Sequence, residues 1–449
     1  MKLAAARSGL QLARAGLQPA HKSVFFIWAG WLAVLLGYQA LVPARLDLAR
    51  PDRALFWTAP ETMRGSQADK YFLNEPFMNA HVAWDSEFYL AIAVDAYESD
   101  QVRHAAVFFD EGSTGGFWPF YVPPNVGRAG GLSLSYAFLP FYPLTMRAVS
   151  APLSIFGMNA VATATLAGVV VSALGALAAM LALYELAKDE LGEEGGIRAA
   201  FYLVIFPSGF FLVQVYTEGL FVGLAFWALL LMRRGRLGWA AALAIAATFT
   251  RAVGVALAIP LFLAWLRTQE WRELDLEWRQ LYFRGVPWRT IAQAMVALSP
   301  LIAYQLWRVS YFGLAFSKVE DAFFSRGLLA LGESFVNWLA SFQSLFGANS
   351  QAAAYNAVEW GAILLGFAAC LIGFRRHPDL AVFGFLVVFL SFTSGVAQGM
   401  HRYILAAPPV FLALARWGRN RAFDTAWTVA SVLLMGLFAT LFTFDLWAG

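Results

Sequence analysis

The feature that most constrains the fold of this chain is a series of apolar segments separated by short charged turns. A helix that crosses a bilayer needs about 20 apolar residues, and fewer when neighbouring helices bury it. About eleven segments qualify: 24–42, 157–187, 197–212, 218–232, 237–250, 252–266, 291–311, 355–374, 380–394, 404–415 and 426–446. Only 14% of the residues are charged, whereas globular domains carry about 25%. The sequence therefore predicts an all-α polytopic membrane protein, with residues 1–449 in a single domain.

The distribution of basic residues orients this series in the membrane, because cytoplasmic loops carry an excess of Lys and Arg. With a cytoplasmic N-terminus and alternating segments, 19 basic residues fall inside. Apart from the long first outer loop, five fall outside: Arg251, Arg308, Lys318, Arg326 and Arg402. The reverse orientation inverts this ratio, so we expect the N-terminus to be cytoplasmic.

Four parts of the chain lie between or before the apolar segments and are long enough to fold outside the bilayer. Residues 1–23 place basic residues among Ala and Leu, which indicates an amphipathic cytoplasmic lead-in before an uncleaved first helix. Residues 43–156 form a long first extracytoplasmic loop, and residues 312–353 form a second, aromatic one. Residues 267–289 form a charged loop on the cytoplasmic side.

The first outer loop contains the acidic, aromatic stretch WDSEFYLAIAVDAY at residues 84–97. If Asp85 opens a helix, Tyr89 shares its face and Glu87 points elsewhere. The residues alone leave three interpretations of Asp85 open. It caps the helix, it acts as the general base for an acceptor hydroxyl, or it binds a divalent cation together with Glu87.

Further charged residues lie at other outward turns. The Thr and Glu of Tyr216–Glu218 either cap the next helix or face an outward cavity. Arg251 and Arg402, the latter preceded by His401, either extend to the membrane surface or bind an anion such as phosphate. Charges at a membrane edge are costly unless they are paired or hydrated. We therefore expect the outward acids and arginines to share one polar cavity.

Several classes of function lack their signatures in this sequence. No basic cluster has the shape of a nucleic-acid footprint, and neither a P-loop nor an H-E-x-x-H motif is present. Cys370 is the one cysteine, so an intrachain disulfide and a cysteine metal site are excluded. No internal repeat is evident, which argues against a transporter built from inverted repeats. We expect no nucleic-acid partner and no required cofactor.

Five stretches taken together resemble a family of membrane enzymes, the PIG-V-type mannosyltransferases and their bacterial relatives. These enzymes add the second mannose to glycosylphosphatidylinositol. The stretch 84–97 is similar to the family's first-loop signature at Trp84, Asp85, Tyr89, Ile92, Ala93 and Tyr97. Ala83 stands where the signature has a basic residue, and Ala96 stands where it has Gly. The other four similar stretches, in the family's order, are Leu139–Arg147, Phe206–Phe221, Thr250–Gly254 and Arg402–Pro408.

The resemblance implies a bundle of the GT-C glycosyltransferase class and a hexosyltransferase that works on the non-cytoplasmic face. The donor implied is a sugar, mannose in this family, carried on a polyprenyl phosphate. The catalytic base implied is Asp85, with inversion at the anomeric carbon. Arg251 and Arg402 would then stabilise the phosphate leaving group. The residues that we expect to contact substrate are Trp84, Glu87, Tyr89, Tyr216, Glu218, Arg251, His401 and Arg402.

Two other functions fit the same pattern of helices and charges. A transporter or flippase of lipid-linked sugar would share the helices and the basic edges, and a non-catalytic membrane scaffold is the third reading. The acceptor stays open among a glycan, a lipid and a protein. The membrane is the plasma (inner) membrane if the chain is bacterial and the endoplasmic reticulum if it is eukaryotic, with the lipid bilayer as a partner in each case.

Overall fold

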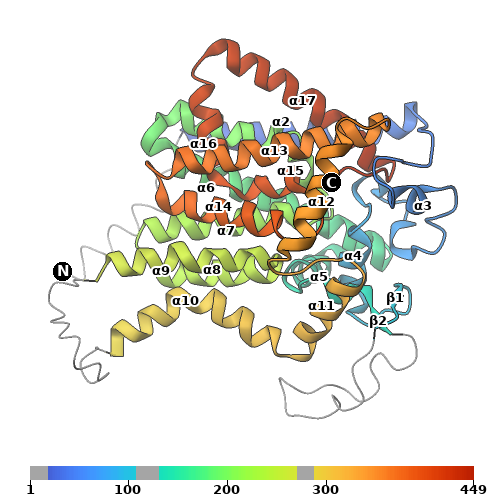
Figure 1. Cartoon of the computed structure of the whole chain (residues 1–449), viewed down its shortest axis with the longest axis horizontal. Helices are drawn as coiled ribbons and strands as arrows, with labels where there is room; N and C mark the ends of the chain where they lie inside the picture. Colours follow the sequence, from blue (N-terminus) through green and yellow to red (C-terminus); the bar gives the residue numbers. More distant parts are fainter. Residues whose placement is uncertain (1–18, 108–130, 270–287) are drawn as a thin grey trace.

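The computed structural model of the protein describes residues 19–107, 131–269 and 288–449. Within them the chain is almost entirely helical (Figure 1). The strands β1 (His104–Ala105) and β2 (Leu132–Ser133) form a short antiparallel pair, with Ala105 opposite Leu132. Most of the predicted lead-in at 1–23 and of the charged loop at 267–289 lies outside the described residues. The predicted all-α class is confirmed.

The elements follow the order that the apolar segments predict. The first helix is α2 (Pro19–Arg45). The long loop after it holds α3 (Thr58–Thr62), η1 (Tyr71–Leu73), η2 (Asn79–His81), α4 (Ser86–Asp95), the strand pair, η4 (Leu134–Ala137), α5 (Phe141–Leu153) and η5 (Ser154–Phe156). Then come α6 (Ala160–Ile205), η6 (Gly209–Leu212), α7 (Glu218–Arg233), α8 (Leu237–Thr250), η7 (Ala252–Leu257) and α9 (Ala258–Arg267). The remaining helices are α10 (Trp288–Arg308), α11 (Tyr311–Ala322), α12 (Leu331–Ser344), α13 (Ser350–Gly373), α14 (Pro378–Phe392), α15 (Met400–Tyr403), η8 (Ile404–Ala406), α16 (Pro408–Trp417) and α17 (Arg421–Thr443).

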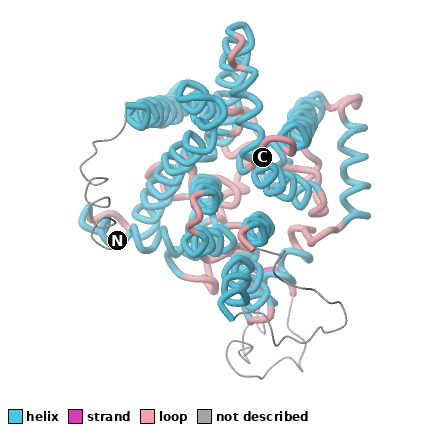
Figure 2. The backbone as a smooth tube through the Cα atoms, turned by 90° about the vertical axis from the view of Figure 1, so that its left-hand side faces the viewer, coloured by secondary structure: helices cyan, strands magenta, loops and turns pink. Residues whose placement is uncertain are grey.

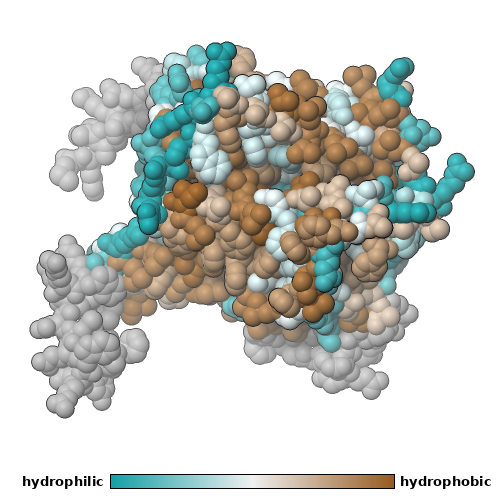
Figure 3. Space-filling model, turned by 45° about the horizontal axis from the view of Figure 1, so that its top comes forward, coloured by the Kyte–Doolittle hydropathy of each residue, from teal (hydrophilic) through white to brown (hydrophobic). Residues whose placement is uncertain are grey.

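Four helices of the described chain are long and apolar enough to cross a membrane, namely α2, α6, α13 and α17. Shorter apolar helices lie at Leu237–Thr250, Ala252–Arg267 and Pro378–Phe392. Figure 3 shows hydrophobic residues over the middle of one face, with hydrophilic residues gathered toward its left and right ends. The chain is therefore an integral, polytopic membrane protein. The count of eleven crossings stays a prediction.

The second and third apolar segments are separated within the predicted turn at residues 188–196, but the break is a single residue in an otherwise helical stretch. Helix geometry continues on both sides of Gly192, which alone departs from it with φ 74° and ψ 177°. The chain folds back there, so that a Cβ on Gly196 would lie 2.8 Å from Cδ2 of Tyr184. A positive φ costs glycine little. One glycine is thus enough to reverse the chain and leave the acidic residues around it helical.

The third segment also ends earlier than its apolar residues suggest. The residue before a proline avoids helical geometry, and Phe206, which precedes Pro207, has φ −52° and ψ 147°. Residues 206–217 then run as a loop with one 3-10 turn, and every residue in this stretch is buried. Figure 2 shows loop segments passing through the middle of the molecule with helices around them. A buried loop of this kind can bring polar groups into a helical bundle.

Charged residues separate into two sets at opposite ends of α7. At its C-terminal end, Arg233 bonds Asp379 at 2.6 Å, and the nearby Arg234 pairs with Glu185. Glu218 begins the helix at the other end. The 16 residues of α7 separate the two ends by about 24 Å, which approaches the thickness of a bilayer core.

Residues after α17 contact the first outer loop. The indole of Trp84 donates to the carbonyl of Leu446 at 3.3 Å, and the backbone N–H of Trp447 donates to Asp52 at 2.6 Å. Rings of Trp57, Trp84 and Trp447 pack edge to face. The C-terminal segment therefore lies at the same end of the bundle as Asp85, as the predicted alternation of segments requires.

Candidate functional site

Asp85 stands at the start of α4 but does not cap it. Its carboxylate accepts no hydrogen bond from the first turn. The backbone is fixed by others instead: the Asp85 N–H donates to the hydroxyl of Tyr216 at 3.1 Å, and the Ser86 hydroxyl donates to the carbonyl of Val215 at 3.1 Å. Trp84 turns the chain into the helix with φ 50°. The capping interpretation is wrong, and the Asp85 carboxylate is left for another partner.

The other end of α4 is held by a motif that the sequence singled out without a role. Arg147 of α5 donates to the carbonyls of Ala93 at 2.8 Å, Ile92 at 3.1 Å and Val94 at 3.2 Å. Carbonyls in the last turn of a helix lack partners within the helix, and a cation there also suits the helix dipole. Arg147 thus anchors the helix that carries Asp85.

Glu218, the first residue of α7, holds two arginines from distant parts of the chain. Its side chain is 2% exposed, and its Oε1 lies 3.1 Å from Nε of Arg402. The same oxygen accepts a hydrogen bond from Arg251, which also donates to the hydroxyl of Thr217 at 3.3 Å. Arg251 follows α8 in a turn so tight that a Cβ on Gly254 would lie 2.6 Å from the Thr248 nitrogen. The turn, the loop before α7 and the carboxylate fix both guanidinium groups.

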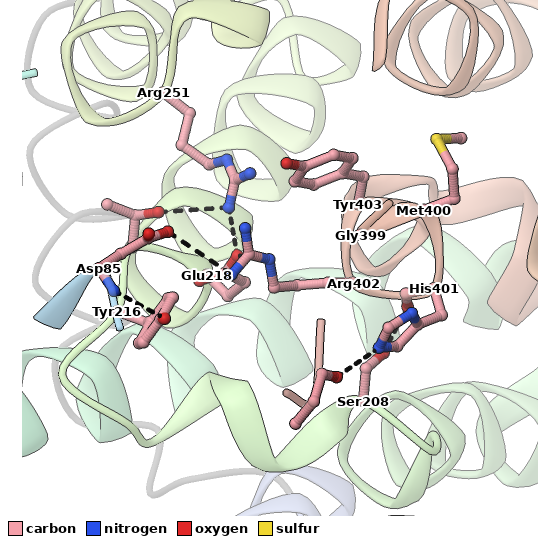
Figure 4. A network of polar contacts seen from close by, with 12 residues as sticks. Asp85, Ser208, Tyr216, Glu218, Arg251, Gly399, Met400, His401, Arg402 and Tyr403 are labelled. Atoms are coloured by element: carbon pink, nitrogen blue, oxygen red, sulfur yellow. Dashed lines mark hydrogen bonds and ion pairs between the residues drawn. The ribbon is translucent and has the colours of Figure 1, made fainter. Parts of the chain in front are cut away.

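Asp85 joins this group through Arg402. Its Oδ2 lies 3.8 Å from Nη1 of Arg402, whose side chain is 7% exposed, whereas the Asp85 side chain is 30% exposed. Rings of Phe211 and Tyr216 lie 5.2 Å from the Arg402 guanidinium. Figure 4 shows Asp85, Glu218, Arg251 and Arg402 pointing toward one another from separate elements. The structure thus brings together four charged residues, each predicted to face outward, that the sequence scatters over more than 300 positions.

Several polar atoms of this cluster have no hydrogen-bond partner among the described residues. They are Oε2 of Glu218 and both Nε and Nη1 of Arg402. Nε of Arg402 lies 3.1 Å from Oε1 of Glu218 without forming a hydrogen bond to it. A small pocket adjoins them, lined by Glu218, Phe221, Val222, Arg251, Val253, Val387, Arg402, Tyr403 and Ala406. Buried donors without partners are costly, so an anionic ligand in the pocket would satisfy them.

The surroundings of Asp85 shift its pKa in the direction that a general base needs. Burial raises the pKa of the Asp85 carboxyl above its ordinary value, and Arg402 and then Arg326 oppose that rise. The residue lies in the first outer loop, outside the spanning helices. A carboxylate with a raised pKa is a stronger base, while the arginines keep its charged form accessible.

Glu87 does not belong to this cluster. Its side chain is buried, its Oε1 has no partner among the described residues, and its charged neighbours are Arg103, Lys70, Asp69 and Glu61. Burial raises the pKa of Glu87 to about 7. Asp85 and Glu87 face different groups, which does not favour the reading in which both hold one cation. In the described parts of the chain, no three His, Cys, Asp or Glu residues are grouped as metal ligands.

His401 also faces away from the cluster. Its ring lies 3.0 Å from Oε1 of Glu359 and 2.8 Å from the carbonyl of Ala448, and it is fully buried. Glu359 additionally accepts from the N–H groups of Gly399 and Met400, both at 2.7 Å. In Figure 4, His401 and Arg402 leave the turn in different directions. His401 therefore holds the turn that carries Arg402, and it does not line the pocket.

The aromatic candidates divide in the same way. Tyr89 and Tyr216 are buried beside the cluster, with ring centres 6.2 Å apart. Burial raises the pKa of the Tyr89 phenol, and the charge of Asp85 adds to that rise. Trp84 packs against Trp57 and Trp447, 5.8 Å and 5.1 Å away. The Tyr216 hydroxyl therefore binds the backbone of Asp85, and Tyr89 packs beside Tyr216. Trp84 instead connects the loop to the C-terminal segment.

Two further residues contribute to this site, Arg326 and Tyr403, to which the sequence assigned no role. Arg326, from the loop between α11 and α12, donates to the hydroxyl of Tyr403 at 2.6 Å. Tyr403 lines the pocket. A signal for Arg326 was present, since it is one of five basic residues on the side that disfavours them. Three of those five, Arg251, Arg326 and Arg402, meet here.

Comparisons with known proteins give weak structural similarity. No family model matches the chain, and no curated protein matches it. The crystal structure of ArnT from Cupriavidus metallidurans bound to undecaprenyl phosphate is similar at a TM-score of 0.38 and 15% identity, over 80% of this chain and 75% of that one. The apo oligosaccharyltransferase of Archaeoglobus fulgidus is similar at a TM-score of 0.37 and 15% identity, over 92% of this chain and 55% of that one. The chain thus spans about half the length of the oligosaccharyltransferase.

Proposed function

We propose that this protein is a membrane glycosyltransferase of the GT-C class. It transfers a sugar, with mannose as the expected one, from a polyprenyl-phosphate donor to a hydroxyl of an acceptor on the extracytoplasmic face. The observation that carries the proposal is the meeting of Asp85 with Arg402, 3.8 Å apart, beside Arg251 and Glu218. One accessible carboxylate next to paired arginines is what an inverting transfer from a phosphate donor needs.

The arrangement supplies the two charges of the reaction. The bond between the anomeric carbon and the phosphate oxygen breaks with its electron pair on the phosphate, and Arg251 and Arg402 stabilise the anion that forms. The acceptor oxygen bonds to the anomeric carbon from the opposite face and gives its proton to Asp85. Glu218 keeps the two arginines in place, and no covalent intermediate is required.

The location of the cluster accounts for a lipid-borne donor. It lies at the end of α7 opposite to the Arg233 and Arg234 end, and the positive-inside rule assigns that basic end to the cytoplasm. Nucleotide sugars are cytoplasmic, so the donor must be carried across the membrane on a lipid. Apolar residues of the pocket, Phe221, Val222, Val253 and Val387, lie on helices of the bundle beside the arginines, where the first units of a polyprenyl chain would fit.

A transfer assay with purified protein tests the proposal. The protein in detergent is incubated with polyprenyl-phosphate mannose and a mixture of glycan, lipid and peptide acceptors, and products are identified by mass spectrometry. We expect a glycosylated product with an inverted anomeric centre. Movement of intact polyprenyl-phosphate sugar across liposomes without any product would instead establish a flippase and overturn the proposal.

A further inference from the structure

Tyr403 occupies the centre of the arginines at the site. It lies in α15, is 8% exposed and lines the pocket with Glu218 and Arg251. Three guanidinium groups lie against its ring, with ring-centre distances of 4.8 Å for Arg251, 5.3 Å for Arg402 and 5.7 Å for Arg326. Each contact is favourable because the face of an aromatic ring is negative. One phenol therefore spaces three positive charges around the pocket.

The hydroxyl of Tyr403 can still donate a hydrogen bond. Its oxygen accepts a hydrogen bond from Nη1 of Arg326 at 2.6 Å, and in the described residues its own hydrogen has no acceptor. Figure 4 shows this hydroxyl directed toward the guanidinium of Arg251, on the side where Asp85 and Glu218 lie. A phenol whose oxygen accepts from a cation is a better hydrogen-bond donor. The free O–H is thus strengthened and placed at the pocket.

The loop that carries Arg326 is built to hold this side chain inward. Ser325, the residue before it, has φ 50°, a conformation that non-glycine residues rarely adopt. The Arg326 N–H donates to the carbonyl of Glu320 at 3.1 Å, and the Gly327 N–H donates to the carbonyl of Ser394 at 3.0 Å. The neighbouring Leu328 is 79% exposed, whereas Phe324 packs against the rings of Phe88 and Phe138, 6.1 Å and 5.7 Å away. Phe324 therefore anchors the start of this loop, and the bonds to Tyr403, Glu320 and Ser394 fix the residues after it.

We propose that Tyr403 is a further catalytic residue of the transfer and that Arg326 is its positioning residue. The Tyr403 hydroxyl donates a hydrogen bond to a non-bridging oxygen of the departing phosphate, and Arg326 orients and polarises it. This rests on the proposed function. No proton leaves Tyr403: the electron pair of the broken bond stays on the phosphate, and the acceptor proton goes to Asp85. Because the phosphate gains charge as the bond breaks, the hydrogen bond strengthens in the transition state and acts on kcat.

A purely structural Tyr403 would behave differently under substitution. Tyr403→Phe keeps the ring that spaces the arginines and removes only the hydroxyl. If the ring alone matters, kcat is unchanged. If the hydroxyl contacts the departing phosphate, kcat falls while KM, which reports mainly ground-state binding, changes little. If Arg326 acts through the hydroxyl, Arg326→Ala adds no further loss once the hydroxyl is gone.

The test measures kcat and KM for full-length protein with polyprenyl-phosphate mannose. The variants are Y403F, R326A, R326K and the double variant Y403F/R326A, with Y71F and R64A from exposed positions of the first outer loop as controls. We expect Y403F to lower kcat about 100-fold, while KM stays within about threefold. R326A should lower kcat comparably, R326K should recover part of the loss, and the double variant should match the worse single variant. Size-exclusion elution and melting temperature in detergent verify that each variant folds.

A second measurement separates this inference from the proposed function. Polyprenyl monophosphate, the product, is titrated into wild type and into Y403F. Y403F should bind it about tenfold more weakly than wild type does. An active wild type with an equally active Y403F, or a double variant whose losses multiply, overturns the role of Tyr403 and leaves the transferase standing. A wild type that neither transfers sugar nor binds polyprenyl phosphate overturns both.

Discussion

The residue on which the site depends for its charge balance is Glu218, because its single buried negative charge is shared by two arginines. Its side chain is 2% exposed and contacts both Arg251 and Arg402. Breaking a buried ion pair from one side leaves an uncompensated charge and costs about 3 to 5 kcal/mol. We therefore expect Glu218→Gln to lower the melting temperature in detergent, and polyprenyl phosphate to raise it more in the variant than in wild type. An equal shift in both would contradict the placement of the phosphate at these arginines.

Arg251 is the more accessible of the two arginines and the simpler one to remove. Its side chain is 18% exposed, and Glu218 keeps Arg402 as a partner when Arg251 is replaced. A charge-assisted hydrogen bond to a phosphate contributes about 1.5 to 3 kcal/mol. Arg251→Ala should thus weaken the binding of polyprenyl phosphate about 10- to 100-fold, as measured by titration calorimetry. Unchanged affinity would remove Arg251 from the phosphate site, and R64A serves as the matched control.

Glu87 gives the first outer loop a pH-dependent stability of predictable sign. Its pKa rises from 4.5 to about 7 in the folded protein because it is buried. Between those values the folded protein binds more protons than the unfolded chain, so the free energy of unfolding falls as pH rises through this window. Glu87→Gln should remove this loss, which amounts to roughly 3 kcal/mol above pH 7.

The neighbouring Glu61 offers a control of opposite sign. Pairing with Lys70 and Arg103 outweighs burial and lowers the pKa of Glu61. Its contribution to stability is therefore present above the ordinary carboxyl pKa and lost as pH falls. Melting temperatures are compared with wild type from pH 5 to 8. At pH 8 we expect the melting temperature of Glu87→Gln to lie above that of wild type and that of Glu61→Gln to lie below it. A Glu87→Gln variant less stable than wild type at pH 8 would contradict the assignment.

At the scale of elements, α4 ends in a residue that fits its position poorly. Ala96 has φ 67° and ψ −157°, a region that only glycine adopts readily and that costs other residues about 1 to 3 kcal/mol. The family that the sequence resembles has Gly there, and the geometry supplies the reason. The Ala96 side chain is exposed, so Ala96→Gly should raise stability by about 1 kcal/mol. Ala151→Gly, at an exposed position within α5, should lower stability instead; a loss for both would refute the strain at Ala96.

Elements also show what the sequence could and could not predict. Apolar length was enough to place most of the long helices, and the basic turns selected charged residues that meet at the site, because both patterns follow from the bilayer. They were not enough to show that Gly192 alone reverses the chain, that Ser86 and Tyr216 fix the start of α4, or that His401 bonds Glu359. Those outcomes depend on which polar groups meet across the bundle. The spacing of residues along the chain does not predict these contacts.

At the scale of the whole molecule, the account requires the site and the basic ends to lie on opposite sides of the membrane. The one cysteine, Cys370, is buried, so single cysteines can be introduced at the exposed positions Asp100 in the first outer loop and Arg236 in the α7–α8 turn. A membrane-impermeant maleimide added to intact cells should label D100C and not R236C, which should react only after permeabilisation. The opposite pattern would place the site in the cytoplasm and overturn the lipid-borne donor.

The most direct test of the central claim compares Asp85→Asn with Asp100→Asn, an exposed aspartate of the same loop, in the sugar-transfer assay. General base catalysis contributes about 10²- to 10⁴-fold to a rate. We predict that Asp85→Asn lowers kcat by that factor while the variant still folds and binds polyprenyl phosphate, and that Asp100→Asn transfers sugar at the wild-type rate. An Asp85→Asn variant as active as Asp100→Asn would contradict the claim that Asp85 accepts the proton of the acceptor.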